Sequence, residues 1–309
     1  MGDREREGAE ALAERLFSAV LGAMDVQSVY LGDKLGLYGA LANGGAMTPP
    51  ELASATGAGE RYIREWLEQQ AVTGLLAVDD PGAPELERRY SLPAGHREVL
   101  ADPDSLHYVA AVARAVGAAG LRLNDIAESV RADGGVSWGR YGPDMALAQG
   151  DANRSLFLSL LGRDVLPGIP DVHGRLSAGG RVADVGCGVG WSSIAIGRAY
   201  PLAQVDGYDV DEPSIVLARE HAREQGLHER VRFHVTDVSE PEPTGSYDLV
   251  AAFECVHDVP RPVEFLASMG RMAGEDGAVL VMDERVAESF AAPGDEIERL
   301  MFGYSITIC

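Results

Sequence analysis

The chain has 309 residues, long enough for two domains that each bury a core. Its 48 acidic and 26 basic residues give a net charge of −22, which disfavours binding to nucleic acid or to anionic membranes. The three separated cysteines argue against a disulfide framework or a structural zinc site, and without an apolar leader or a span of ~20 apolar residues we expect a cytoplasmic protein.

The first part of the chain is predicted to be helical. Leu12, Leu16, Val20 and Met24 recur every four residues and form one apolar stripe on a first helix. The helical pattern continues over 29–41, with these core candidates: Leu31, Leu35, Leu37 and Leu41. Because the stripe lies on a long helical arm, we expect a homodimer that forms through the N-terminal helices.

Residues 48–92 carry the signals of two short helices and a hairpin. Thr48-Pro-Pro-Glu51 is typical of a helix start, with Thr48 as N-cap and Glu51 completing a capping box. A helix to Ala55, a turn at 57–59 and a helix over 61–73 follow. The second helix is expected to bury Ile63, Trp66, Leu67 and Val72. Segments 75–78 and 90–92 flank a turn-rich stretch and are predicted to pair as a hairpin.

Helix, turn, helix and hairpin together predict a winged-helix-like domain over residues 1–100. One interpretation is a DNA-binding regulator, and the other is a dimerisation or lid module that keeps only the shape. Since the second helix carries Arg61 and Arg64 against Glu60, Glu65 and Glu68, few phosphate contacts are available. We therefore favour the second interpretation and expect no nucleic-acid partner.

Residues 101–170 are predicted to form a helical linker and lid. Two helical stretches over 105–132 are broken near 117–120, a loop covers 134–143, and an amphipathic helix covers 153–165. Trp138, Tyr141 and Trp191 are candidates for the lining of an acceptor cavity, although each is equally explained as ordinary packing.

From Arg181 onward, strand and helix patterns alternate. The predicted strands are 181–186, 204–209, 231–236, 247–253 and 277–283. The predicted helices are 191–200, 213–226, 261–272 and one near 295–302. This alternation predicts an α/β fold with a Rossmann-like, doubly wound parallel sheet.

The first of these strands ends in a glycine-rich turn that opens into a helix. Glycines at 186, 188 and 190 let the backbone approach a ligand closely. The next helix then directs its first amides toward that ligand. A dinucleotide-binding fingerprint would need its third glycine at 191, where this chain has Trp191.

Acidic residues follow the second and third strands. Asp209 ends the second strand 19 positions after Gly190, where a carboxylate can accept hydrogen bonds from two ribose hydroxyls. Asp211 is expected to cap the next helix. Asp237 can accept from an adenine amino group, with a backbone amide from Val238, or it can form an Asx turn. His234 is expected to be a packing residue.

The fourth strand continues into Glu254-Cys-Val-His257-Asp258. His257 is the histidine that we place at the pocket, either as a general base for an attacking hydroxyl or as a residue that holds the loop. Asp258 is also explained as part of the start of the next helix. Cys255 lacks a basic partner and is not a nucleophile candidate. No acidic cluster at the pocket indicates a metal ion.

Several segments of the chain, in order, resemble one family. They are Gly186-Cys-Gly-Val-Gly-Trp-Ser-Ser, Gly207-Tyr-Asp-Val-Asp-Glu, Glu254-Cys-Val-His-Asp, Pro260-Arg-Pro-Val, Asp283-Glu-Arg-Val and Glu298-Arg-Leu-Met. Residues 181–286 resemble a class I methyltransferase domain dependent on S-adenosylmethionine (SAM). The whole chain resembles an actinobacterial-type family of methyltransferases with an N-terminal winged helix.

This resemblance implies that residues 171–309 form the SAM-binding domain. The implied cofactor contacts are Asp184, Gly186, Cys187, Gly188, Gly190, Asp209, Val210, Asp237, Val238, Phe253 and Glu254. It also implies methyl transfer to a small-molecule acceptor, most simply at oxygen, with His257 as base. The alternatives are a non-catalytic SAM-binding winged-helix regulator and a truncated, inactive methyltransferase.

The end of the chain departs from the family pattern. Class I sheets usually continue with an antiparallel hairpin after the fifth strand, whereas this sequence ends in the apolar run 302–309. We therefore expect a truncated product with the fifth strand as an open edge, and with lower stability or activity than a longer relative.

Overall fold

The computed structural model describes residues 3–132, 134–239 and 247–309, with side chains from residue 8 onward. It divides into two compact units, Met1–Gly120 and Leu121–Cys309, each of which is described on its own. The predicted divisions after residues 100 and 170 stay predictions. In the described part of the chain, no helix combines the length and the apolar character that crossing a bilayer requires.

The first unit is a winged-helix arrangement, as predicted. Its elements are α1 (Asp3–Lys34), α2 (Leu37–Gly44), α3 (Pro49–Thr56), α4 (Glu60–Val72), β1 (Ala77–Val78), β2 (Tyr90–Ser91), α5 (Ala94–Leu100) and α6 (Ala110–Gly120). The predicted capping box begins α3, because the side chain of Thr48 accepts from the amide of Glu51 and that of Glu51 accepts from the amide of Thr48. The hairpin pairs Ala77 with Ser91 in antiparallel fashion.

Most of the predicted core of this unit is buried: Leu37, Leu41, Ile63, Trp66 and Leu67. Three predicted core residues are wrong. Val72 is 87% exposed because it lies nine residues after Ile63, which places it on the opposite face of α4. Leu31 and Leu35 are each 49% exposed. Leu31 lies on the far side of α1 from the buried Val29, and Leu35 follows the end of that helix.

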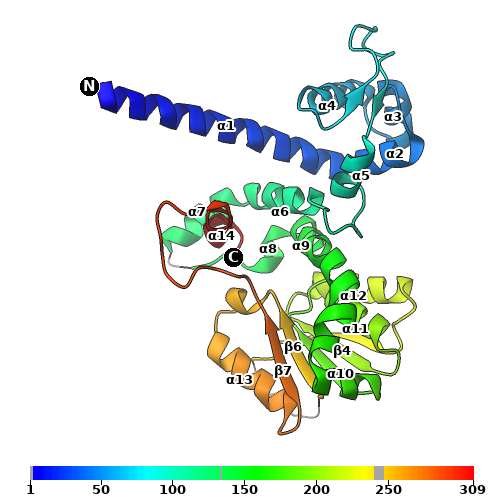
Figure 1. Ribbon diagram of the computed structural model, residues 1–309, viewed down its shortest axis with the longest axis vertical. Coiled ribbons are helices and arrows are strands. Elements are labelled where there is room, and N and C mark those ends of the chain that lie inside the picture. Colours follow the sequence, from blue (N-terminus) through cyan, green and yellow to red (C-terminus); the bar gives the residue numbers. More distant parts are fainter. Residues whose placement is uncertain (1–2, 133, 240–246) are drawn as a thin grey trace. The chain divides into compact units, whose positions relative to one another are not determined.

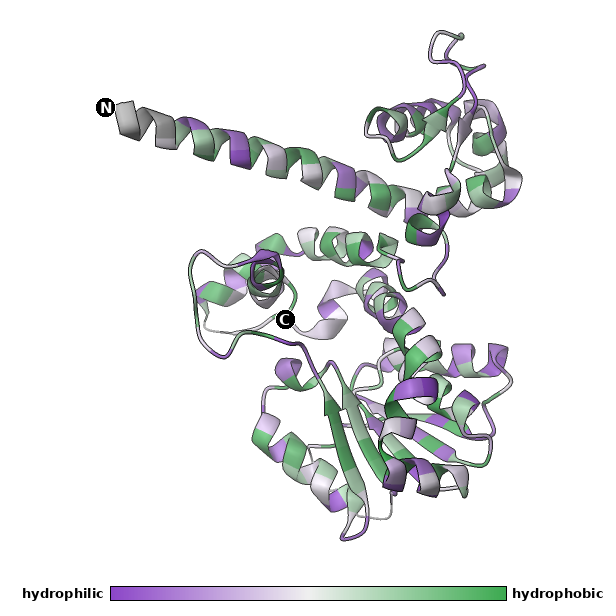
Figure 2. Ribbon diagram, viewed as in Figure 1, coloured by the Kyte–Doolittle hydropathy of each residue, from purple (hydrophilic) through white to green (hydrophobic). Residues whose placement is uncertain are grey.

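The predicted apolar stripe on α1 is exposed along its whole length. Leu12, Leu16, Val20 and Met24 are each about half exposed, and Phe17 between them is 64% exposed. The first half of α1 extends away from the other helices of its unit (Figure 1), and green hydrophobic positions recur along it (Figure 2). No described residue of this unit covers the stripe.

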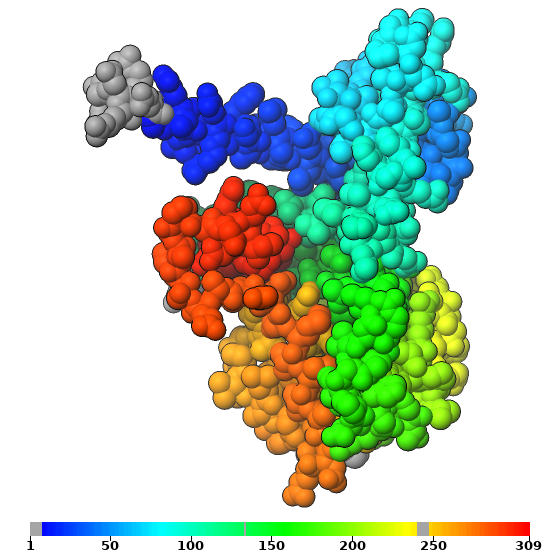
Figure 3. Space-filling view, viewed as in Figure 1, coloured from blue at the N-terminus to red at the C-terminus, as the bar shows by residue number. Residues whose placement is uncertain are grey.

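The second unit contains a five-stranded parallel sheet in the order β5-β4-β3-β6-β7, as predicted. Its strands are β3 (Arg181–Val185), β4 (Gln204–Asp209), β5 (Val231–Val235), β6 (Leu249–Phe253) and β7 (Ala278–Met282). From β3 the chain adds β4 and β5 on one side and then β6 and β7 on the other, so the strand order reverses between β3 and β6. Ligands bind at this reversal point in open α/β sheets. β7 is an edge strand, and its residues (orange in Figure 3) reach the surface.

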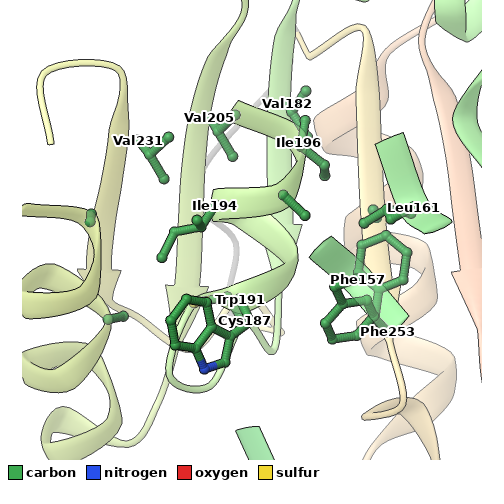
Figure 4. Packing of buried hydrophobic residues seen from close by; sticks show 14 of the residues in the cluster. Phe157, Leu161, Val182, Cys187, Trp191, Ile194, Ile196, Val205, Val231 and Phe253 are labelled. Carbon is green, nitrogen blue, oxygen red and sulfur yellow. The ribbon is translucent and has the colours of Figure 1, made fainter. Parts of the chain in front are cut away.

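Helices cover both faces of this sheet (Figure 1). They are α10 (Pro170–Ser177), α11 (Trp191–Ala199), α12 (Glu212–Glu224) and α13 (Pro262–Ala273). The unit also contains the 3-10 turn η3 (Val256–Asp258) after β6 and the helix α14 (Glu296–Thr307) near the end of the chain. One face packs against α11, where Ile194 and Ile196 lie against Val182, Val205 and Val231 (Figure 4). The other face packs against α13.

The segment before the sheet differs from its prediction. It contains α7 (Leu123–Arg131), α8 (Trp138–Tyr141), α9 (Pro143–Leu156), a π-helix η1 (Phe157–Val165) and a 3-10 turn η2 (Leu166–Gly168). The helix break predicted near 117–120 lies slightly later, between Gly120 and Leu123. Gly117 and Gly120 both belong to α6. α8 lies within the loop predicted over 134–143. The helix predicted over 153–165 begins ten residues earlier, at Pro143, and its second part is the π-helix η1.

Candidate functional site

A cavity of about 750 Å³ lies in the second unit at the carboxyl ends of β3, β4, β5 and β6. All the predicted site residues except Asp184 line it, including His257. Trp138 and Trp191 also line it. Tyr141 is buried outside the lining, and its hydroxyl donates to the carbonyl of Thr307 at 3.1 Å. The structure thus brings Trp138 and His257, which are 119 positions apart in the chain, into one cavity lining.

The glycine turn is attached to the neighbouring strand by its backbone. The amide of Gly188 donates to Oδ2 of Asp209 at 2.8 Å. Gly188 has φ +50°, and no atom lies within 4 Å of a Cβ built on it, so its bare Cα faces open space in the cavity. Gly190 has φ +89°, and a Cβ there would lie 2.7 Å from Phe233. One glycine therefore leaves room for a ligand and the other allows close packing.

Asp184 is fully buried below this turn. Its Oδ2 accepts hydrogen bonds from the hydroxyls of Ser192 and Ser193, both at 2.6 Å. Burial raises the pKa of Asp184 to about 6. The geometry shows that Asp184 ties the start of α11 to β3, while its cofactor contact stays a prediction.

Asp209 presents a carboxylate at the tip of β4. Its second oxygen, Oδ1, accepts from the amide of Asp211 at 2.9 Å. Burial raises the pKa of Asp209, although backbone donors stabilise the charged form. Asp211 caps α12 as predicted, because its Oδ2 accepts from the amide and the hydroxyl of Ser214. Each oxygen of Asp209 has further lone pairs for a ligand.

Asp237 forms the predicted Asx turn, while its contact with adenine stays a prediction. Its Oδ1 accepts from the amide of Ser239 at 2.8 Å, which is an Asx turn, and the residue also lines the cavity. His234 lies outside the lining. Its Nε2 contacts Asp206 at 3.1 Å and its ring stacks on Tyr208, in agreement with a packing role.

Glu254 is held in an unusual backbone conformation at the end of β6. Its φ of +51° is the only positive φ of a non-glycine residue in the described part of the chain. Its Oε2 accepts from Nδ2 of Asn153 at 2.5 Å, and burial raises its pKa. The sequence analysis missed Asn153. The signal for it was the spacing of Gln149, Asn153 and Phe157, which places all three on one side of a helix.

His257 is oriented by a carboxylate that the sequence analysis also missed. Its Nδ1 lies 2.5 Å from Oδ1 of Asp283, and its Nε2 lies 3.7 Å from Asp258. Hydrogen bonds with Cys309 and with Asp283 raise the pKa of His257 to about 10, against the opposite effect of burial. The imidazole is therefore protonated at neutral pH. Asp283 directly follows β7, and Asp237 follows β5 with one residue between them. The sequence signal for Asp283 was therefore its position just after a strand.

His257, Asp258 and Cys309 each present one atom of a metal-ligand type, all within 4.8 Å of one another. Nδ1 of this histidine is committed to Asp283, and three donors leave a metal ion incompletely bound. The arrangement fits proton transfer at Nε2 more directly than metal binding.

Two family models match the chain, one for each part. Residues 176–302 match a model described as "Methyltransferase domain", and residues 9–102 match an "Rv2258c-like winged HTH domain". Residues 176–302 form a methyltransferase domain. The cavity lies at the strand tips of this domain, and the winged-helix domain precedes it.

Curated relatives match about a third of the chain. A segment of 113 residues is 37% identical to a ubiquinone biosynthesis O-methyltransferase of Bordetella bronchiseptica and covers 36% of this chain and 45% of that protein. A segment of 100 residues is 29% identical to the ajmaline N-methyltransferase of Rauvolfia serpentina and covers 32% of this chain and 34% of that protein. The matches thus span less than half the length of these relatives.

Solved structures resemble nearly the whole chain. The mitomycin 7-O-methyltransferase MmcR is 25% identical with a TM-score of 0.68, covering 99% of this chain and 87% of that one. Human N-acetylserotonin methyltransferase, solved in complex with SAM, is 20% identical with a TM-score of 0.69, and the match also covers 99% of this chain and 87% of that one. This similarity shows the fold alone. The methyltransferase domain and the winged-helix domain therefore occur together in known folds.

Proposed function

We propose that the chain is a SAM-dependent methyltransferase that methylates a small-molecule acceptor at oxygen. The observation that carries this proposal is the convergence of the glycine turn, Asp209, Asp237 and His257 on one cavity. The O-methyltransferases among the relatives support the same chemistry.

The residues present fit SAM in shape and charge. The open space over Gly188 accepts a ligand against bare backbone, and the free lone pairs of Asp209 match a ribose diol. Asp237 and the amide of Val238 are available to an adenine edge. Phe253 and Glu254 then border the methionyl part. SAM supplies, when bound, a methyl group on a positively charged sulfur.

The chain's own residues then align the acceptor and move its proton. In the neutral form of His257, Asp283 holds the proton on Nδ1, which leaves Nε2 to take the proton of the acceptor hydroxyl. Apolar side chains exclude water from the same cavity. They are Phe157, Phe265, Val286, Met301 and Ile308.

The N-terminal winged-helix domain serves, in this proposal, as an assembly module. The stripe on α1 has the width and spacing of a helix–helix contact surface, and we infer that a second copy of the chain covers it. Val20→Arg is expected to give monomers in light scattering. Ser18→Arg, on the opposite face of α1, is the matched control. A monomeric wild-type chain overturns this part of the proposal.

Nucleic acid is not a partner in this proposal, because four arginines of the winged helix are paired with carboxylates of the same domain. Arg61 pairs with Glu65, Arg64 with Glu85, Arg88 with Glu68, and Arg89 with Glu51. Such pairs leave little charge for phosphate contacts. A gel-shift assay at low salt is expected to show no complex with duplex DNA, and a stable complex would favour the regulator instead.

Calorimetric titration with SAM tests the main proposal. Wild type is expected to bind, Asp209→Ala to lose binding, and Glu212→Ala, which removes an exposed neighbouring carboxylate, to bind normally. A screen of hydroxylated aromatic compounds, read out as S-adenosylhomocysteine formed, then finds the acceptor class. The proposal fails if wild type does not bind, and the ribose site is misplaced if Asp209→Ala binds as well as wild type.

A further inference from the structure

Trp191 occupies a fixed position in the cavity wall. It is the first residue of α11, is 4% exposed, and lines the cavity. The guanidinium carbon of Arg154 lies 4.2 Å from the centroid of its ring. The ring of His221 stacks nearly parallel on it, with centroids 4.5 Å apart. The indole is therefore held by a cation and by a second ring packed against it.

The polar atom on that edge has no partner. Nε1 of Trp191 is buried, and no described residue accepts a hydrogen bond from it. Figure 4 shows this nitrogen on the edge of the ring that faces away from the strands. A buried donor without a partner is unfavourable and rare, so its presence in a cavity wall indicates a ligand that accepts from it.

The surroundings of this donor favour an anion. An indole N–H donates and never accepts, and the first turn of α11 adds partial positive charge. The guanidinium of Arg154 adds a full charge. Elsewhere the charged part of the lining consists mainly of carboxylates, with His257 and Arg261 as cations. The carboxylates include Asp209, Asp237, Glu254, Asp258 and Glu284. Trp191 therefore marks a locally positive position in a negative cavity.

We propose that Nε1 of Trp191 binds the methionyl carboxylate of SAM, assisted by Arg154 and the amino end of α11. This inference rests on the proposed function and deepens it. The carboxylate is the one anionic group of SAM, whereas its sulfonium and ammonium groups are cationic. The cofactor tail is thus oriented by charge, with its carboxylate at Trp191 and its cationic groups toward Glu254 and Asp258.

Binding of two ligands to one variant tests this inference. SAM carries the carboxylate, and 5′-methylthioadenosine keeps the adenosine part without the amino-acid tail. Trp191→Phe removes the donor, and we expect it to weaken SAM binding by ~10-fold or more, as for a hydrogen bond to a charged group. Binding of 5′-methylthioadenosine is expected to stay within about twofold of wild type, because ring packing is largely kept.

Two further variants separate hydrogen bonding from packing. Replacement of Trp191 by 3-benzothienylalanine keeps the bicyclic shape without the N–H, so it tests the bond even where Trp191→Phe folds poorly. Trp66→Phe removes a buried indole N–H that donates to the carbonyl of Ser28 in the first unit, and it is expected to lower the melting temperature without changing SAM affinity.

The outcomes distinguish this inference from the function on which it rests. Equal losses for both ligands, or no loss for SAM, overturn the role of Trp191 and leave the methyltransferase proposal intact. Wild-type protein that binds neither ligand overturns both.

Discussion

The amide of Gly188 donates to Oδ2 of Asp209 at 2.8 Å, which joins the turn after β3 to the tip of β4. The proposed cofactor site is therefore joined by a hydrogen bond between its two elements. A change in the glycine turn is felt by the carboxylate, and the two elements are expected to lose cofactor affinity together.

Two glycines of this turn are predicted to respond differently to alanine. Gly188→Ala places a methyl group in open cavity space, so it is expected to cost about 1–2 kcal/mol of stability while weakening SAM binding at least ~10-fold. Gly190→Ala forces a methyl group against Phe233 at a φ of +89°, and about 2–4 kcal/mol of stability is expected to be lost. Urea unfolding and calorimetry measure the two effects. Equal stability losses would contradict the assignment.

Gly150 of α9 is predicted to be required because it lies on Val189. A Cβ on Gly150 would lie 2.1 Å from Cγ2 of Val189, so Gly150→Ala is expected to destabilise the protein by about 1–3 kcal/mol. In a Val189→Ala background the obstacle is gone, and the better helix propensity of alanine then makes the same change neutral or stabilising. A double-mutant cycle checks this reversal of sign. Simple additivity would refute the contact.

Activity is predicted to rise with pH. Hydrogen bonds with Cys309 and with Asp283 raise the pKa of His257 to about 10, and only the neutral ring accepts a proton. The value of kcat/KM should therefore increase from pH 7 toward pH 10. Asp283→Asn removes one cause of the shift and should move the rise to lower pH. A flat profile, or one that Asp283→Asn leaves unmoved, would exclude His257 as the base.

The same shift has a defined sign for stability. The folded pKa of His257 lies above the unfolded value of about 6.5, so its contribution is complete below pH ~6.5 and is lost as pH rises through about 10. Thermal melts of wild type and His257→Ala should therefore converge at high pH.

The buried ion pair of the first unit is predicted to be important for its stability. Nε of Arg114 lies 2.5 Å from Oδ2 of Asp33, and the two side chains are 13% and 10% exposed. Arg114→Leu leaves a buried carboxylate without this cation, and a loss of about 3–5 kcal/mol in urea unfolding is expected. Arg61→Leu breaks an exposed pair with Glu65 and should cost less than about 1 kcal/mol. Similar losses in the two variants would contradict this prediction.

The sheet and the strand-end half of the cavity were predictable from sequence because short-range patterns define them. All five strands begin and end within two residues of their predicted positions, since a glycine or an acidic residue lies at the end of each strand or within two residues after it. Asp209 and Asp237 follow from the same rule, which places the carboxyl ends of parallel strands at one edge.

The acceptor half was less predictable because distant contacts define it. Gly150 and the wide turns of η1 weaken the helical pattern of α9, so the start of that helix was missed. Asn153 and Asp283 have partners 101 and 26 residues away, and no local pattern announces such pairs. Val72 shows the opposite error, in which an apolar residue was assigned to the core without regard to its angle around α4.

The π-helical segment η1 has a consequence for how this protein can change. Side chains before it, such as Gln149 and Asn153, line the cavity, while Gly162 within it packs against Ala199 of α11. Deleting one residue from η1 would rotate the two halves of this long helix by about 100° relative to one another. An insertion or deletion in η1 would therefore present different side chains of α9 to the acceptor. The hydrophobic interior around the sheet would stay unchanged.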